Sequence, residues 1–475
     1  MADTDALWAL LTEAAEPEAA AALKREVETA PDMRLNRINA LAFAAEHKLD
    51  EDAAIGAFVR ASKLGLFDMS WNALCPGCGG VLESTAALKT LDRSHYFCSL
   101  CVESYEPNLD ERVEVTFTVN SRVRRIAAHD PDSLSLPEYS RQIFWSSAVD
   151  LPGNFEELIE RVAINVIELE RGEKGSMSLS VPVGQSLVFE PVTHTTIFLD
   201  VAGETTHERR NLSLLMSDEH SHSGVMKLQP GPVRISVENR SSRRTLPGVW
   251  ILGEELHRVF RSRRPFLTAT RAFSNQTFRD IYRNGTLDSE QRFKITNLTF
   301  LFTDLRGSTA LYDRVGDLAA FDLVRSHFGA LISAVSAEGG AVVKTIGDAV
   351  MATFASPERA LRAAIRMRAA MREINRARGA EDLALNIGLH EGPCLAVVLD
   401  DRQDYFGQSV NIASRVQGLA DPSAILATRP IVETPEVASL LAASGMRTSS
   451  RESALRGVRE ALTIYAIHEE DAAAA

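Results

Sequence analysis

Apolar residues recur along the chain with two different periods, and the change between them divides it into regions. Up to about residue 74 the period is close to 3.6, as in Leu7, Leu10 and Leu11. The stretch 50–65 opens with acidic residues and ends in Gly65, which is typical of a capped helix. We therefore predict a helical N-terminal module over residues 1–74.

From about residue 112 to 252 the pattern becomes a strict alternation of apolar and polar residues. VEVTFTV and TTIFLDV are examples, and Gly, Pro and Asn separate such segments. We expect an antiparallel β sandwich or barrel, with a helical insertion around Ser140–Glu170. Domains of this kind commonly hold a small ligand or a partner. The region also contains four histidines without repeated ligand spacing, which we interpret as solvated loop residues: His194, His207, His220 and His222.

Residues 253–296 are expected to form a predominantly helical connector. We interpret it as an arginine-rich helix that docks on the acidic rest of the chain, and a surface for an anionic ligand or membrane is the alternative. The arginines concerned are Arg258, Arg261, Arg263, Arg264 and Arg271.

The stretch 341–354, AVVKTIGDAVMATF, predicts a β hairpin. Two apolar runs flank Gly347 and Asp348, which both tolerate the positive φ of tight hairpin turns. Lys344 inside the first run and Asp348 at the tip need an explanation, because burying either of them unpaired is costly. A surface ion pair between them, worth about 1 kcal/mol or less, is the simplest one.

The segments around this hairpin add further polar groups. The apolar strand LTFLFTDL ends at Asp304, before a Gly-containing turn and a helix expected over Thr309–Ala337. This order places the backbone amides of 305–308 at a helix N-terminus, where phosphates bind. Beyond the hairpin we expect a helix over 357–376, then two strands. Asp404 follows them, before a helix with Asn411 and Arg415 one turn apart.

Composition limits the classes of protein that fit. With 475 residues, 45% hydrophobic and 24% charged, we expect a globular chain of two to four domains. A net charge of −13 argues against general attraction to nucleic acid or anionic lipid. We find neither a secretory signal nor an apolar run long enough to span a membrane, so we expect a soluble, cytoplasmic protein.

Four of the five cysteines form two C-x-x-C pairs, Cys75 with Cys78 and Cys98 with Cys101. This spacing predicts a closed tetrahedral Cys₄ site for structural Zn²⁺ in a zinc ribbon over residues 75–111. Zinc ribbons often bind nucleic acid, but only Lys89 and Arg93 are cationic between the pairs. Nucleic acid is therefore the less favoured partner.

The segments FTDLRGST, KTIGD, GLHEG and DYFGQSVNIASR occur in that order in the C-terminal region. Together they resemble the class III adenylyl and guanylyl cyclase catalytic domain, over residues 297–468. The resemblance implies a ferredoxin-like α/β domain, so the whole chain is expected to be a multidomain α+β protein. It further implies a bacterial-type cytosolic regulatory region, 1–252, that acts through the connector.

The resemblance also implies a role for each matching residue. Asp304 and Asp348 would hold two Mg²⁺ or Mn²⁺ ions, while Lys344 and Asp404 would read the base. An ammonium and a carboxylate complement the N1 acceptor and 6-amino donor of adenine, which predicts ATP over GTP. Asn411 would orient the ribose, and Arg415 would neutralise charge on the α-phosphate in the transition state. The products would be 3′,5′-cyclic AMP and pyrophosphate.

In this family the site lies between two catalytic domains, and this chain has one copy. A homodimer with two symmetric sites is therefore implied. The regulatory ligand or partner and the contacts to the β- and γ-phosphates stay unassigned. A guanylyl cyclase, and a zinc-ribbon regulator that binds nucleic acid and only senses nucleotide, are the alternatives.

Overall fold

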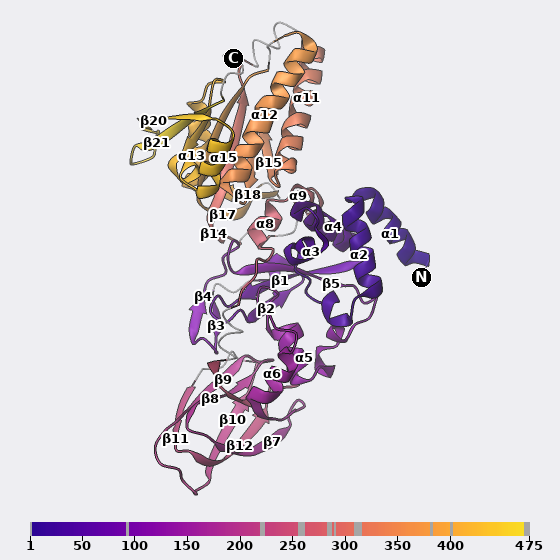
Figure 1. Cartoon of the computed structure of the whole chain (residues 1–475), viewed down its shortest axis with the longest axis vertical. Coiled ribbons are helices and arrows are strands. Elements are labelled where there is room, and N and C mark those ends of the chain that lie inside the picture. Colours follow the sequence, from indigo (N-terminus) through magenta and orange to yellow (C-terminus); the bar gives the residue numbers. More distant parts are fainter. Residues whose placement is uncertain are drawn as a thin grey trace. The chain divides into compact units, whose positions relative to one another are not determined.

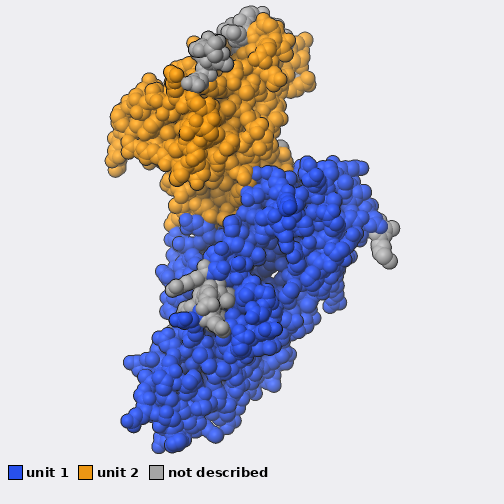
Figure 2. Space-filling model, viewed as in Figure 1, with its two compact units in different colours: residues 1–107, 111–267 blue, residues 108–110, 268–475 orange. Residues whose placement is uncertain are grey.

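The structure is a computed structural model that describes residues 2–91, 95–218, 224–254, 262–282, 287–288, 291–307, 316–380, 383–399 and 402–469. The chain forms two compact units (Figure 2). Unit 1 contains residues 1–107 and 111–267, and unit 2 contains residues 108–110 and 268–475. Among the described residues, no helix is both long and apolar enough to cross a membrane. The division into five modules predicted from the sequence stays a prediction.

Unit 1 begins with four helices, as the 3.6 period predicted (Figure 1). They are α1 (Ala2–Ala14), α2 (Pro17–Thr29), α3 (Ala40–His47) and α4 (Glu51–Lys63). Asn39 caps α3 by accepting hydrogen bonds from the backbone N–H groups of Leu41 and Ala42. Asp50 caps α4 in the same way through the N–H group of Ala53, at 2.9 Å.

The helical prediction for 1–74 is wrong at its end, because residues Phe67–Leu74 form strand β1. Gly65 ends the preceding helix with a φ of 79°. Strand β1 lies between β2 (Val81–Thr85) and β5 (Val113–Val119) in an antiparallel sheet. Strands β3 (Tyr96–Cys98) and β4 (Glu103–Tyr105) form a separate hairpin beside the cysteines.

The region 112–252 contains a two-sheet sandwich with one shared core. Met177, Val188 and Ile235 are buried between the sheets. One sheet has the order β10–β12–β7 and the other β11–β9–β8–β13–β6. The strands are β6 (Ala163–Val166), β7 (Lys174–Val181), β8 (Gly184–Glu190), β9 (Thr195–Val201), β10 (Arg210–Met216), β11 (Gly224–Leu228), β12 (Gly231–Asn239) and β13 (Gly248–Ile251).

The expectation of a wholly antiparallel arrangement is wrong for two pairs, since β10–β12 and β11–β9 are parallel. From β9 to β13 each successive strand lies in the other sheet. Strands β9 and β11 therefore run in the same direction in one sheet, as do β10 and β12 in the other, and each pair is parallel.

The insertion is only partly helical. It contains α5 (Leu136–Tyr139), a π-helical turn (Ser140–Phe144) and α6 (Phe155–Val162), and the chain then enters β6.

In the part of the connector that the structure describes, fewer residues are helical than expected. Its described residues contain two short helices, α8 (Ala269–Phe273) and α9 (Gln276–Ile281), both in unit 2. Arg263 and Arg264 donate hydrogen bonds to the backbone carbonyls of Gly77 and Ser147. Arg258 and Arg261, and the helix break expected at residues 284–285, lie outside the described residues.

Unit 2 is built on one sheet, which has eight strands in the described residues. Its order is β15–β16–β14–β17–β19–β21–β20, and β18 pairs with β17. Among these described strands only the β17–β19 pair is parallel. The strands are β14 (Phe293–Leu305), β15 (Ala341–Ile346), β16 (Ala349–Phe354), β17 (Leu385–Leu399), β18 (Arg402–Phe406), β19 (Ile425–Thr428), β20 (Arg447–Ser453) and β21 (Leu462–His468). The two strands expected after the second helix are thus one continuous strand, β17.

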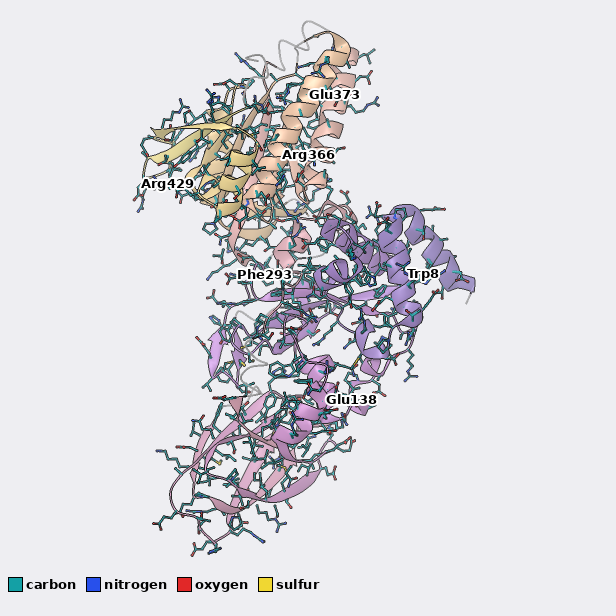
Figure 3. The ribbon with its side chains drawn as sticks, viewed as in Figure 1. Trp8, Glu138, Phe293, Arg366, Glu373 and Arg429 are labelled. Atoms are coloured by element: carbon teal, nitrogen blue, oxygen red, sulfur yellow. The ribbon has the colours of Figure 1, made fainter. Side chains whose placement is uncertain are left out.

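Helices cover both faces of this sheet. Helices α11 (Asp317–Ala337), α12 (Pro357–Arg378), α14 (Arg429–Val432) and α15 (Pro435–Ala443) share one core with it. Met367 lies in that core, whereas Arg366 and Glu373 project from the exposed side of α12 (Figure 3). Helix α13 (Gln408–Gly418) covers the opposite face through Ile412 and Val416.

Candidate active site

Two aspartates lie side by side where β14 ends and the β15–β16 hairpin turns. Thr303 of β14 pairs with Val350 of β16, so the next residue, Asp304, lies opposite Ala349 and next to Asp348. Gly347 has a φ of 62° and occupies the first central position of the two-residue turn, where glycine is favoured. The hairpin that the sequence predicted is confirmed.

The carboxylate of Asp348 affects the pKa of Asp304. Burial raises the pKa of Asp304, and the negative charge of Asp348 raises it further. Oδ2 of Asp348 is buried and accepts no hydrogen bond within the described part of the chain. A buried carboxylate oxygen without a donor is costly, and a cation shared with Asp304 would relieve it. The donor set therefore fits the hard divalent ions Mg²⁺ and Mn²⁺.

His327 of α11 is a neighbour of this pair that the sequence did not indicate. Its ring is fully buried, and neither ring nitrogen has a hydrogen-bond partner among the described residues. Burial lowers its pKa to about 4, although the charge of Asp348 acts in the opposite direction. The imidazole is therefore neutral at physiological pH. A single histidine in an apolar helix carries no pattern by which it could have been recognised.

Lys344 pairs with Asp404, not with Asp348, so the simple surface ion pair considered from the sequence is not what forms. The Lys344 Nζ donates a hydrogen bond to Oδ2 of Asp404, while the backbone N–H of Tyr405 donates to Oδ1 at 2.8 Å. The Lys344 side chain is 41% exposed and that of Asp404 only 9%. A register shift between Val342 and Lys344 distorts β15 at this point.

Asn411 and Arg415 lie one turn apart on α13, as predicted. Asn411 is exposed and Arg415 is partly buried. Among the described residues Arg415 has no ion pair, and its guanidinium lies against Gly457, where a methyl group would be 3.4 Å from Nη1. The residue is available to an anion. Residue 308 of the expected phosphate-binding turn and residues 309–315 of the expected helix lie outside the described residues, and α11 is described from Asp317.

Helix α9 contacts the backbone beside both members of the Lys344–Asp404 pair. The Gln276 side-chain oxygen accepts a hydrogen bond from the N–H of Val342, two residues before Lys344, at 2.8 Å. Arg279 donates to the carbonyl of Gln403 at 2.8 Å, and its guanidinium lies 5.9 Å from the centre of the Tyr405 ring. Lys344, Gln276 and Arg279 also line one cavity of about 340 Å³.

The four paired cysteines converge in unit 1, and their sulfur atoms all lie within 4.8 Å of one another. Sγ of Cys75 is 3.5 Å from that of Cys101, and Sγ of Cys78 is 3.7 Å from that of Cys98. A tetrahedron with Zn–S bonds of about 2.3 Å has S–S edges of about 3.8 Å. Gly77 leaves room for this approach, since a methyl group there would lie 2.8 Å from Sγ of Cys101. The thiols therefore fit a closed zinc site.

Comparison with known families separates the chain into two matched regions. Residues 1–280, more than half of the chain, match a family of unknown function, DUF5939. The chain belongs to the DUF5939 family. Residues 290–469 of this DUF5939 chain match the adenylate and guanylate cyclase catalytic domain. The C-terminal region is thus a class III nucleotidyl cyclase catalytic domain, as the four motifs indicated.

Individual relatives match part of the chain. An adenylate cyclase of Anabaena cylindrica is 31% identical over 188 residues, which cover 36% of each chain. An uncharacterized protein of Mycobacterium tuberculosis is 40% identical over 126 residues, or 26% of this chain and 31% of that one. The DUF5939 chain thus spans about a third of the length of these curated relatives. A matching solved structure, the adenylyl cyclase CyaB from P. aeruginosa, is 26% identical over 38% of this chain and 96% of that one, with a TM-score of 0.33.

The family boundary falls inside α9. The DUF5939 match ends at residue 280, whereas the compact unit that holds the cyclase domain already includes residue 268. Helices α8 and α9 therefore belong to the N-terminal family by sequence and to the catalytic unit by packing.

Proposed function

We propose that this chain is an adenylyl cyclase that converts ATP to 3′,5′-cyclic AMP and pyrophosphate on a ferredoxin-like catalytic core. The observation that carries the proposal is the Asp304–Asp348 pair, with its buried oxygen lacking a donor, inside a cyclase-type domain. Adenylate cyclases among the relatives support the choice of reaction.

Each polar residue has one task in this mechanism. Asp304 and Asp348 hold the two divalent ions, which supply activation of the ribose 3′-oxygen and charge neutralisation when bound. Lys344 donates to N1 of adenine and Asp404 accepts from its 6-amino group. Asn411 orients the ribose, and the permanently charged Arg415 stabilises the negative charge that grows on the α-phosphate.

The assembly that supports this chemistry is a homodimer. Asp304 and Asp348 lie at the end of β14 and the adjoining hairpin, whereas α13 covers the face of the sheet opposite α11 and α12. One subunit would supply the metal ligands, and its partner the base-reading pair with Asn411 and Arg415. We further propose that Zn²⁺ in the Cys₄ cluster is structural and that the N-terminal region regulates turnover through α8 and α9.

Product formation by the purified full chain tests the proposal. With ATP and Mn²⁺ we expect cyclic AMP, and with GTP a lower initial rate. Asp348→Ala should reduce turnover by roughly 10²-fold or more, the loss expected when a principal charge-stabilising group is removed. Asp322→Asn, at an exposed carboxylate on α11, is the matched control and should retain activity. Absence of cyclic AMP, or equal activity in Asp348→Ala, would refute the assignment.

A further inference from the structure

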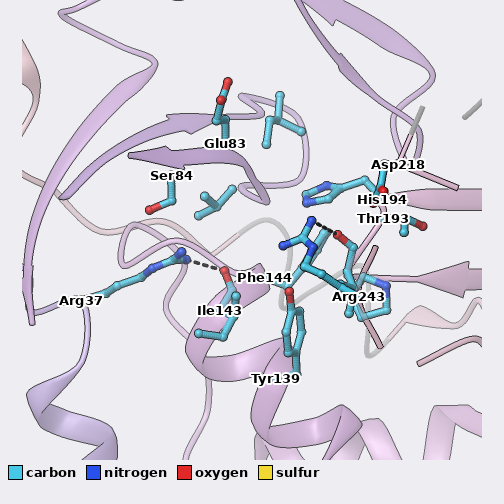
Figure 4. A pocket seen from close by; sticks show the side chains of 14 residues that line it. Arg37, Glu83, Ser84, Tyr139, Ile143, Phe144, Thr193, His194, Asp218 and Arg243 are labelled. Carbon is cyan, nitrogen blue, oxygen red and sulfur yellow. Dashed lines mark hydrogen bonds between the residues drawn. The ribbon is translucent and has the colours of Figure 1, made fainter. Parts of the chain in front are cut away.

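A second cavity, of about 380 Å³, lies wholly within unit 1, in the DUF5939 region (Figure 4). Segments distant in sequence form it: the loop before α3, strand β2, the π-helical turn and the loop between β8 and β9. Phe144, Ile143 and Val192 give it an apolar side, while Arg37, Arg243 and Tyr139 give it a polar one. Two carboxylates, Glu83 and Asp218, also line the cavity, and Asp218 accepts a hydrogen bond from the backbone N–H of Ser242. A cavity with an apolar wall and a few converging polar groups is typical of a small-molecule site.

The two arginines of the cavity lack carboxylate partners. Arg37 donates through Nη1 to the carbonyl of Ile143, and Arg243 donates through Nη2 to the carbonyl of Val192 at 3.4 Å. Neither guanidinium forms an ion pair within the described part of the chain. The nearby buried Glu114 is already engaged by hydrogen bonds from Asn72 and Ser147. Carbonyl partners leave most of the guanidinium N–H groups, and their charge, open to an anion.

Tyr139 adds a hydroxyl donor at the same place. The residue is 5% exposed, and no hydrogen bond of its hydroxyl to another described residue is present. Figure 4 shows this hydroxyl directed into the cavity, toward Arg243. Buried tyrosine hydroxyls normally have a hydrogen-bond partner. A ligand oxygen would provide one.

Backbone strain is concentrated around the same cavity. Arg37 and His194, with φ of 46° and 55°, are two of the four non-glycine residues with positive φ in the described chain. The cavity-lining residues Ile143 and Phe144 end a π-helical turn, a rare element that is frequent at functional sites. Strain of this kind persists only where surrounding contacts enforce it, and it clusters at ligand sites.

Buried hydrogen bonds provide that enforcement. The carboxylate of Glu190, which is fully buried, accepts from the backbone N–H groups of Val192, Thr193 and Leu246. Ser99, between the second pair of cysteines, donates its hydroxyl to the carbonyl of His194. The β8–β9 loop is therefore held in its strained form before any ligand arrives.

We propose that this cavity binds a small organic anion whose carboxylate or phosphate group lies between Arg37, Arg243 and the Tyr139 hydroxyl, and whose apolar part packs against Phe144 and Val192. The inference concerns binding alone and stands apart from the cyclase reaction. Paired guanidiniums suit both kinds of anion, because each presents oxygens that match the fork of N–H donors.

Calorimetric titration of the full zinc-loaded chain tests the site with three probes: benzoate, phenyl phosphate and uncharged benzamide. We expect at least one anion to bind with a Kd of about 1 mM or tighter, and benzamide not to bind. The anion that binds more tightly identifies carboxylate or phosphate as the natural group.

Variants locate the binding. Arg243→Gln should weaken it at least tenfold, and Arg37→Gln should do the same where the variant folds. Arg240→Gln is the matched control, because Arg240 is exposed, pairs with Glu238 and does not line the cavity. Failure of both anions to bind, equal binding of benzamide, or unchanged affinity in Arg243→Gln would overturn the proposal.

Discussion

Burial, and then the nearby negative charge of Asp348, raise the pKa of Asp304. A carboxyl whose pKa is raised in the folded state stabilises the fold while protonated and loses that contribution as pH rises through the raised pKa. At neutral pH the metal-free pair is therefore a source of instability, which divalent ions relieve. The two carboxylates thus lower the folding stability of the metal-free protein, but they provide the ligands for the metal ions.

Asp304→Asn should separate these two properties. We expect the metal-free variant to melt at a higher temperature than the wild type at neutral pH, because one charge is removed. The stabilisation by Mn²⁺ and the cyclase activity should both be lost. Thermal melting with and without Mn²⁺ measures this, and Asp322→Asn should behave as the wild type. A lower melting temperature of metal-free Asp304→Asn would contradict the account.

Exchange of the base-reading pair is the second test at this scale. Lys344→Glu combined with Asp404→Cys removes the ammonium and carboxylate that complement adenine. We expect the ratio of initial rates on ATP and GTP to fall by roughly 10²-fold, because buried polar groups that lose their partners discriminate strongly. An unchanged ratio in an active double variant would show that these residues do not read the base.

At the scale of elements, local patterns and distant contacts differ in what they reveal. The β15–β16 hairpin and α12 follow from Gly347 and from the periodic apolar residues, and both formed as predicted. Strand β1 was missed because its assignment depends on pairing with Val119 and its neighbours, far along the chain. The contacts of Arg279 and Gln276 with β18 and β15 are likewise tertiary, and no spacing in the sequence records them.

A variant of Arg279 in α9 tests whether this residue positions Asp404 or only stabilises the fold. Arg279→Met keeps an unbranched apolar stem but removes the donor to the carbonyl of Gln403. We expect a lower ATP/GTP rate ratio with an unchanged half-saturating Mn²⁺ concentration, because only the Asp404 side of the site shifts. Arg279→Lys should recover part of the ratio. Equal loss on both nucleotides would indicate a general structural role.

Measurement of the zinc content tests the proposed Cys₄ site. Cys98→Ser should abolish one bound Zn²⁺ per chain and destabilise unit 1, because structural zinc contributes on the order of 10 kcal/mol to small sites. Cys394→Ser is the matched control, a buried cysteine of unit 2 outside the cluster. Elemental analysis with thermal melting reads out both variants. Full zinc content in Cys98→Ser would refute the Cys₄ site.

For the whole molecule, subunit mixing tests the shared active site. Asp304→Ala and Arg415→Ala should each be inactive alone, since each removes one half of every site. After co-expression, half of the randomly formed dimers are mixed, and each mixed dimer carries one intact site. We expect about a quarter of wild-type activity. No recovery, with mixed dimers present by mass spectrometry, would place both residues in one subunit's site.

Residues 108–110 join the catalytic unit although they lie far from it in sequence. Asp110 accepts hydrogen bonds from the backbone N–H groups of Thr296 and Asn297, where β14 shifts register, and Leu109 donates to the carbonyl of Lys294. A catalytic fragment that begins anywhere between residues 111 and 290 would lack residues 108–110. The backbone groups of Lys294, Thr296 and Asn297 would then lose these hydrogen-bond partners. Low activity in such a fragment would then report a missing tripeptide rather than a missing regulator, and supplying residues 108–110 in trans or by fusion would tell the two apart.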